Sequence, residues 1–174
     1  KKGGSGTFFV MIFFPPGSQS ARTLPLPSCF MSSHNLEEVG KGFALEGTYL
    51  GAEPYGSGHI NDTYVAAYEQ GAGPMRYLHQ RINHQIFKNP PLLMENILRV
   101  TSHARQALAR AGASEIDRRT LTVLPSQQGL PYWQDTQGNF WRTYYFIEQA
   151  ETFDRVESPA QAHAAAAAFG QFQK

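Results

Sequence analysis

The sequence predicts an α+β fold in which a small antiparallel sheet of about five strands is covered by one packed helix. Three observations predict this class. Three β-rich segments follow one another between residues 48 and 82, a long stretch near residues 91–111 has the period of an amphipathic helix, and more β-rich segments follow it. Because the links between the first three segments are short, an antiparallel meander is expected.

Composition limits the classes of protein to which the chain can belong. Its 174 residues suit about one domain, and 41% hydrophobic residues are enough for a core. Fifteen Lys and Arg against 14 Asp and Glu leave a net charge of +1, which does not suit a nucleic-acid-binding protein. No apolar run reaches the ~20 residues that span a bilayer. Cys29 is the single cysteine, so an internal disulfide is excluded. We expect a cytoplasmic protein without a nucleic-acid or membrane partner.

Residues 1–46 are predicted to be a leader that precedes the folded domain. Up to residue 30 the chain combines Lys1-Lys2, a short apolar run at 7–14, and prolines among small polar residues. A disordered leader or translated upstream sequence, with a natural start at Met31, is the favoured interpretation; a secretory signal or an ordered strand are the alternatives. The chain begins without methionine and ends in an alanine-rich stretch, so we expect a fragment.

The domain itself is expected to span residues 47–148. Its first three strands are predicted at 48–55, 62–69 and 75–82, with turns at 56–58 and 71–74. In the third strand Met75, Tyr77 and His79 should lie on one face, and Arg76, Leu78, Gln80 and Ile82 on the other.

A helix, a strand and a hairpin are predicted after the meander. Asn89-Pro90-Pro91 should open the helix and Gly112 should end it. The helix carries an apolar stripe that should pack on the sheet: Leu93, Ile97, Val100, Ala104, Ala107, Leu108 and Ala111. A fourth strand is expected at 119–124, and a hairpin at 130–134 and 139–148. Ser158-Pro159 should begin a last helix over 160–172, within a separate segment at 149–174.

A glycine-containing turn between the first two strands is the first candidate site. Gly56, Ser57, Gly58, His59, Ile60 and Asn61 form this turn. Glycines there let backbone N–H groups approach an anionic ligand such as a phosphate. Asn61 stands where a kinase loop has its third glycine, and asparagine tolerates left-handed backbone better than most residues. An ordinary hairpin turn is the alternative.

Three further candidates lie on neighbouring elements. Arg81, at the end of the third strand, could pair with nucleotide phosphates or be a surface arginine. Glu95 could form an ion pair with Arg81, although it lies roughly 200° around the helix from Leu93. Phe146, Ile147 and Glu148 could offer backbone groups to an adenine edge, or simply end the last core strand. The histidines show no metal-ligand spacing, so zinc is not expected.

Taken together, these segments resemble the aminoglycoside-phosphotransferase superfamily, and within it the N-acetylhexosamine 1-kinase group. The resemblance runs from about residue 47 to 173 and is carried by the following motifs: Gly56 to Tyr64, Gln80 to Asn83, Phe87 to Pro90, Met94 to Ile97, Trp141-Arg142 and Phe146-Ile147. It implies a protein-kinase-like N-terminal lobe and transfer of the ATP γ-phosphoryl group, with Mg²⁺, to the anomeric hydroxyl of an N-acetylated hexosamine.

The chain departs from the family in one respect. Such enzymes need an aspartate base in a His-Gly-Asp-type loop and a second acidic motif that holds magnesium, and neither occurs here. We expect these groups beyond Lys174, so that residues 149–174 are the hinge exit and the first helix of a catalytic lobe, and the chain alone is inactive. Two alternatives stay open: a kinase for another alcohol such as an aminoglycoside, choline or homoserine, and a non-catalytic nucleotide-binding module.

Overall fold

A computed structural model of the chain describes residues 34–56, 60–71, 73–148, 150 and 155–172. These residues fall into two compact units, of which one ends at Ile147 and contains the sheet. The other begins at Glu148 and contains α4 (Pro159–Phe172), where the backbone N–H of Gln161 donates to the hydroxyl of Ser158 over 3.2 Å. The helix predicted at 160–172 is thus confirmed. The leader prediction for residues 1–33 lies outside the described residues.

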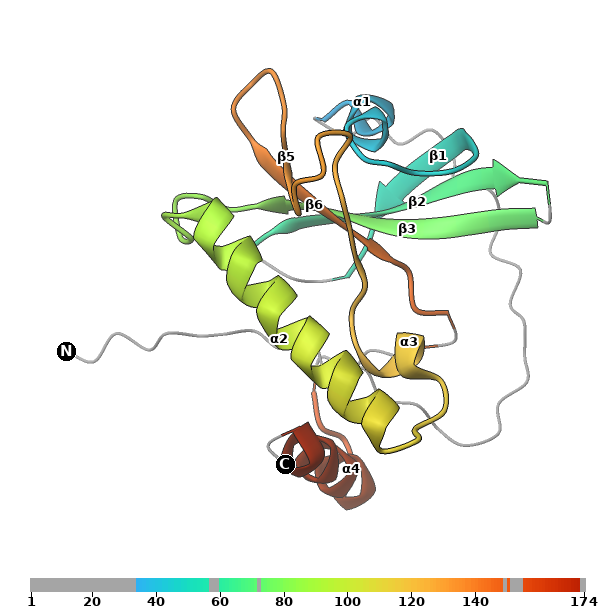
Figure 1. The fold of residues 1–174 in the computed structure, drawn as a ribbon, viewed down its shortest axis with the longest axis vertical. Coiled ribbons are helices and arrows are strands. Elements are labelled where there is room, and N and C mark those ends of the chain that lie inside the picture. The colour runs from blue at the N-terminus through green and yellow to red at the C-terminus, as the bar shows by residue number, and fades with distance from the viewer. Residues whose placement is uncertain (1–33, 57–59, 72, 149, 151–154, 173–174) are drawn as a thin grey trace. The chain divides into compact units, whose positions relative to one another are not determined.

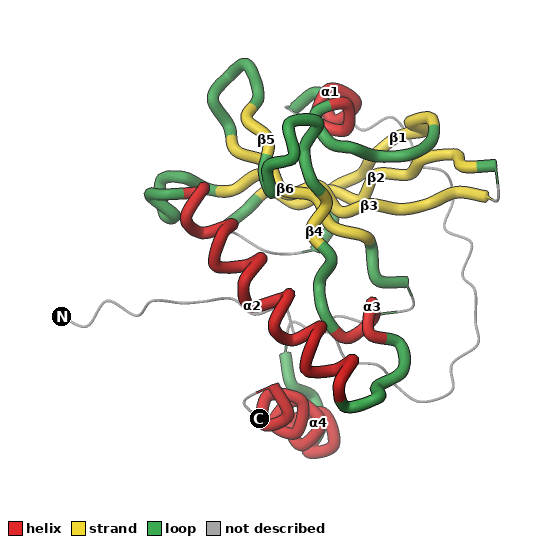
Figure 2. The backbone as a smooth tube through the Cα atoms, viewed as in Figure 1, coloured by secondary structure: helices red, strands yellow, loops and turns green. Residues whose placement is uncertain are grey.

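Six antiparallel strands form one sheet, which confirms the α+β class (Figure 2). The order is β1-β2-β3-β6-β4, and β5 pairs with β6. The strands are β1 (Thr48–Pro54), β2 (Asp62–Gln70), β3 (Gly73–Ile82), β4 (Val123–Leu124), β5 (Trp133–Gln134) and β6 (Phe140–Tyr145). The first three strands match the predicted meander. They form where Thr, Tyr and Val residues suit a pleated surface. The pairs Ala52↔Ala66 and Tyr64↔His79 set their register.

Two helices lie on opposite sides of this sheet (Figure 1). The short helix α1 (Leu36–Lys41) packs on the face that carries Tyr64 and Trp141. The long helix α2 (Pro90–Arg110) meets the other face near its beginning, where the sulfur of Met94 lies 3.9 Å from Nη1 of Arg142. Each face of the sheet therefore has its own helix.

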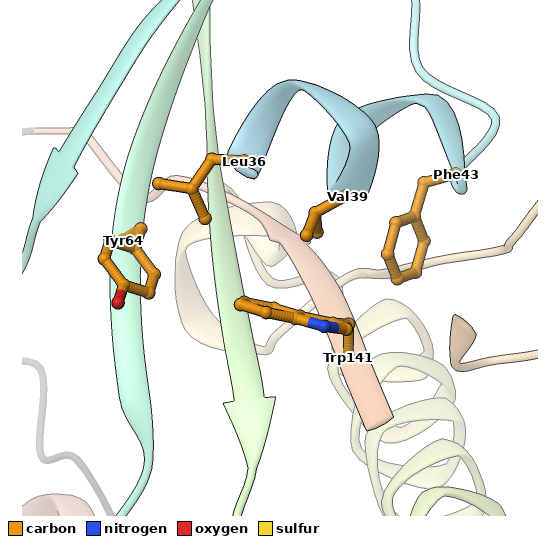
Figure 3. Packing of buried hydrophobic residues seen from close by; sticks show 5 residues of the cluster. All are labelled: Leu36, Val39, Phe43, Tyr64 and Trp141. Carbon is orange, nitrogen blue, oxygen red and sulfur yellow. The ribbon is translucent and has the colours of Figure 1, made fainter. Parts of the chain in front are cut away.

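The α1 segment belongs to the core, so the predicted boundary of the domain at residue 47 is wrong. Leu36, Val39 and Phe43 are buried against Tyr64 and Trp141 (Figure 3). The Asn35 side chain caps the helix by accepting from the N–H of Glu38 over 3.2 Å. This cap and the apolar residues at spacings of three and four fold the segment as one short amphipathic helix.

The bounds of α2 were predicted well, but its packing was not. The only buried residues of α2 are Pro90 and Met94, whereas Leu93, Ile97, Ala104 and Leu108 of the expected stripe are half-buried. Val100 is 47% exposed. Farther along, Arg105 donates to Asp117 over 2.7 Å and to the hydroxyl of Thr122 over 2.5 Å, so the second half of α2 is held by polar contacts.

The strand predicted at 119–124 is shorter than expected. Residues Ile116–Arg119 form a helical turn, α3, and only Val123 and Leu124 pair with β6. The hairpin that follows is confirmed, with the turn that joins β5 and β6 at Asp135–Gly138. Gly138 has a φ of +83°, which a glycine adopts without strain.

Asp135 fixes this turn through its carboxylate. It accepts hydrogen bonds from the backbone of Gln137 and Asn139, from the Asn139 amide and from the Trp141 indole, at 2.8–2.9 Å. Burial works against the charge of Asp135, but these hydrogen bonds outweigh it and lower its pKa. The turn is thereby tied to Trp141 in the core.

Candidate functional site

The alternation of side chains divides the candidate residues between the two faces of the sheet. On β3, Tyr77 and His79 are buried on the α1 side, and the His79 ring stacks with Phe43 at 6.2 Å. Gln80 points to the other side, where it bonds to Arg142 beside α2. The predicted face assignment of β3 is confirmed for these residues. We call the side that carries Gln80 and Arg142 the α2 face.

The glycine-containing turn is described only at its two ends. Gly56 is exposed with a φ of +80°, and, apart from Gly56 and its chain neighbours, no atom of the described residues lies within 4 Å of a Cβ built on it. Ser57, Gly58 and His59 lie outside the described residues. Ile60 and Asn61 are half-buried, and the Asn61 side chain accepts from the N–H of Asn83 over 2.9 Å.

Asn61 therefore does not replace a third glycine in the way we expected. Among the described residues other than glycine, Glu115 is the only one with a positive φ. Asn61 contributes its side chain instead, which fastens the end of the turn to the end of β3.

The residue before this turn and the residue after β6 meet on the α2 face. The rings of Tyr55 and Phe146 lie 5.3 Å apart in an edge-to-face arrangement. The Arg76 guanidinium stands over the Phe146 ring, 4.3 Å from its centroid. Tyr55 and Phe146, which lie far apart in the sequence, thus form one aromatic surface next to the first described residue of the glycine-containing turn.

The three hinge candidates differ in what they offer a ligand. The N–H of Phe146 donates to the backbone oxygen of Arg76 over 3.1 Å, so this N–H already has a partner within the sheet. The Phe146 ring in turn contacts Tyr55 and the Arg76 guanidinium. Ile147 is half-buried, and Glu148 is exposed at the start of the second unit.

Arg81 lies on the α1 side of the sheet, away from Tyr55 and Phe146. Its Nε donates to Oδ2 of Asp62 over 2.7 Å and its Nη2 lies 2.5 Å from the same oxygen. Asp62 is its direct neighbour across β2 and β3, and His34 lies 3.6 Å from the same carboxylate. The expectation that Arg81 and the residues after β6 face one ligand is therefore wrong, because alternation places them on opposite faces.

Glu95 is not brought to Arg81 either. It is exposed on α2, and it makes no ion pair with any residue of the described ranges. The expected Arg81–Glu95 pair is replaced by Arg81–Asp62. The physical reason is that Arg81 lies on the α1 side of the sheet, whereas α2 packs on the opposite face.

Besides Arg76, the α2 face carries a second cation, Arg142, which was not among the predicted site residues. Its Nε and Nη2 donate to Oε1 of Gln80 over 2.9 and 2.5 Å. Gln80 in turn donates from Nε2 to the hydroxyl of Thr63 over 2.7 Å. The alternation of residues 142 and 144 along β6, continued to Phe146 just after it, was the signal that could have found Arg142, because it places Arg142 and Phe146 on the same side.

The described part of the chain was also compared with the requirements of a metal site and of a membrane-spanning helix. It holds no group of three His, Cys, Asp or Glu side chains that could bind a metal ion. None of its helices combines the length and the apolar character needed to cross a bilayer. The sequence matches no model of a known protein family.

Proposed function

We propose that residues 34–147 bind ATP, and that they form the nucleotide-binding lobe of a small-molecule kinase of the aminoglycoside-phosphotransferase type. The contact between Tyr55 and Phe146 carries this proposal, since it joins the glycine-containing turn to the segment after β6. Aromatic faces of this kind stack on a flat base such as adenine. The open backbone at Gly56 gives phosphates room to approach.

The acceptor that we propose is the anomeric hydroxyl of an N-acetylhexosamine, on the strength of the motif resemblance alone. Phosphoryl transfer needs a base near this hydroxyl and acidic ligands for Mg²⁺ between the phosphates. The described residues offer no acidic cluster of this kind. In this proposal, therefore, the chain binds the nucleotide but does not by itself transfer the phosphoryl group.

Isothermal titration calorimetry with ATP tests the nucleotide site. Phe146→Ala should weaken ATP binding at least tenfold, because it removes the ring that stacks on the base. Tyr145→Ala is the matched control: Tyr145 is the last residue of β6 and directly precedes Phe146, but its ring packs on Tyr77 on the α1 side. The control should bind ATP within about twofold of the unaltered chain. Absence of ATP binding at millimolar concentration would refute the proposal.

A second assay separates binding from catalysis. ADP release with ATP, Mg²⁺ and N-acetylglucosamine or N-acetylgalactosamine should stay at the background rate for this chain, even where calorimetry shows that ATP binds. Turnover above background would show that the acidic residues of this chain are sufficient for catalysis. It would contradict the proposal that the chain binds ATP without transferring the phosphoryl group.

A further inference from the structure

We infer that Arg142 is the residue that contacts the phosphates of the bound nucleotide, in the role that the motif resemblance implied for Arg81. This inference rests on the proposed function, because it names the anion-binding residue of the same site. Its starting point is charge. Within the described ranges Arg81, Arg105 and Arg118 each lie within 4.0 Å of a carboxylate. On the α2 face the Arg76 guanidinium stands over the Phe146 ring, and Arg142 has no carboxylate of the described residues within 4.0 Å.

The partners of Arg142 hold its guanidinium without neutralising it. Two of its N–H groups are engaged by a neutral amide oxygen of Gln80, its Nη1 faces the Met94 sulfur, and its Cζ lies 5.5 Å from the Tyr144 ring centroid. The side chain is half-buried between the sheet and α2. A half-buried cation with no carboxylate within 4.0 Å among the described residues is a strong site for an anion, because nearby low-dielectric groups weaken its screening.

Hydrogen bonds connect this cation to the glycine-containing turn. Gln80 bridges Arg142 to Thr63, which lies two residues after Asn61 at the end of the turn. Tyr55, at the other end, pairs its N–H with the backbone oxygen of the same Thr63 over 2.9 Å. Since Tyr55, Thr63, Gln80 and Arg142 are all on the α2 face, a nucleotide with its base on Tyr55 and Phe146 extends its phosphates over one face of one sheet.

Arg81, the cation that the motif resemblance implied, has the opposite properties. Arg81 is on the α1 side, 27% exposed, and its charge is already matched by Asp62. To bind a phosphate it would have to give up this carboxylate and reach around the edge of the sheet. Arg142 requires neither change.

The test compares ATP, ADP and adenosine by calorimetry on the unaltered chain and on two charge-removing variants. Arg142→Gln should weaken ATP and ADP binding at least tenfold and leave adenosine binding unchanged, because adenosine carries no phosphate. Arg81→Gln should change ATP binding less than twofold. Gln80→Leu, which frees the guanidinium from its anchor, should weaken ATP severalfold and again spare adenosine. Circular dichroism melts establish that each variant is folded.

The outcomes separate this inference from the proposal beneath it. If the unaltered chain binds neither ATP nor adenosine, the proposed function fails and the inference with it. If ATP binds but Arg142→Gln does not weaken its binding, or Arg81→Gln weakens it instead, only the inference is overturned.

If Arg142→Gln does not fold, Arg142→Lys takes its place. This variant keeps the charge but loses the forked hydrogen bonds to Gln80, so it should bind ATP more weakly than the unaltered chain and with a steeper dependence on salt. Equal binding by the lysine variant at every salt concentration would contradict the inference.

Discussion

His79 is the most fully enclosed ionisable side chain of the sheet. It has no exposed surface, its Nδ1 lies 2.8 Å from the Thr143 hydroxyl, and its Nε2 lies 3.5 Å from the Tyr68 hydroxyl. Burial lowers the pKa of His79 from 6.5 to about 4. The folded chain therefore holds this histidine neutral at a pH where an unfolded chain would protonate it.

This shift predicts a loss of stability in mild acid. The unfolded state binds one more proton than the folded state between pH 6.5 and 4, so the free energy of unfolding should fall as the pH drops through this window. The full effect of one such group is roughly 3 kcal/mol. Urea denaturation at pH 7, 5.5 and 4.5 measures it. His79→Gln keeps a polar partner for Thr143 and should flatten the dependence; an equally steep slope in this variant would assign the effect to other groups.

At the scale of elements, the two helices contribute differently to stability. The small helix α1 buries its apolar side chains completely, whereas the much longer α2 contacts the sheet mainly at Met94. Length and helical period are therefore poor guides to which helix belongs to the core. Gly40 illustrates why: a Cβ there would lie 1.8 Å from the Tyr68 hydroxyl, so a residue that weakens helices in isolation is what lets α1 approach the sheet.

The same substitution in each helix tests this difference. Val39→Ala, at a side chain that is 2% exposed, should lower the free energy of unfolding by roughly 2 kcal/mol through lost burial and a small cavity. Val100→Ala, at a side chain that is 47% exposed, should be neutral or slightly stabilising, since alanine favours helices. Chemical denaturation of both variants gives the comparison. A larger loss at Val100 would mean that the predicted stripe is buried after all.

Across the whole molecule, the sequence predicted the secondary-structure elements that depend on local pattern. It did not predict the side-chain contacts between elements that are distant in the sequence. The meander follows from alternating residues between glycine-containing turns, and α2 from Asn89, two prolines and a helical period. Alternation could also have placed Arg81 beside Tyr77 and His79. The Arg81–Asp62 pair and the Gln80–Arg142 pair depend on strand register, which could not be predicted from the sequence pattern. The helix α1 was missed because it is short, contains Gly40 and is followed directly by Gly42.

The overall charge of the chain predicts how its solubility depends on pH. A net charge of +1 and an isoelectric point of about 8.1 leave little repulsion between molecules near pH 8, while Leu50, Val156 and Phe169 present apolar surface. Self-association, followed by sedimentation velocity, should be strongest near pH 8 and weaken at pH 6.3, where the chain is farther from its isoelectric point and carries more net charge. Phe169→Ser should reduce it at both pH values. Association that grows toward pH 6.3 would contradict this account.

The placement of the two tryptophans has an optical consequence. Trp141 is fully buried and Trp133 half-buried, both in the cluster beneath α1, and the chain contains no others. The intrinsic emission of the chain therefore reports on the α1 side of the sheet, shifting to longer wavelength when α1 detaches and water reaches the indoles. A ligand on the other face would leave this emission nearly unchanged, so the undocking of α1 can be followed separately while that ligand is bound.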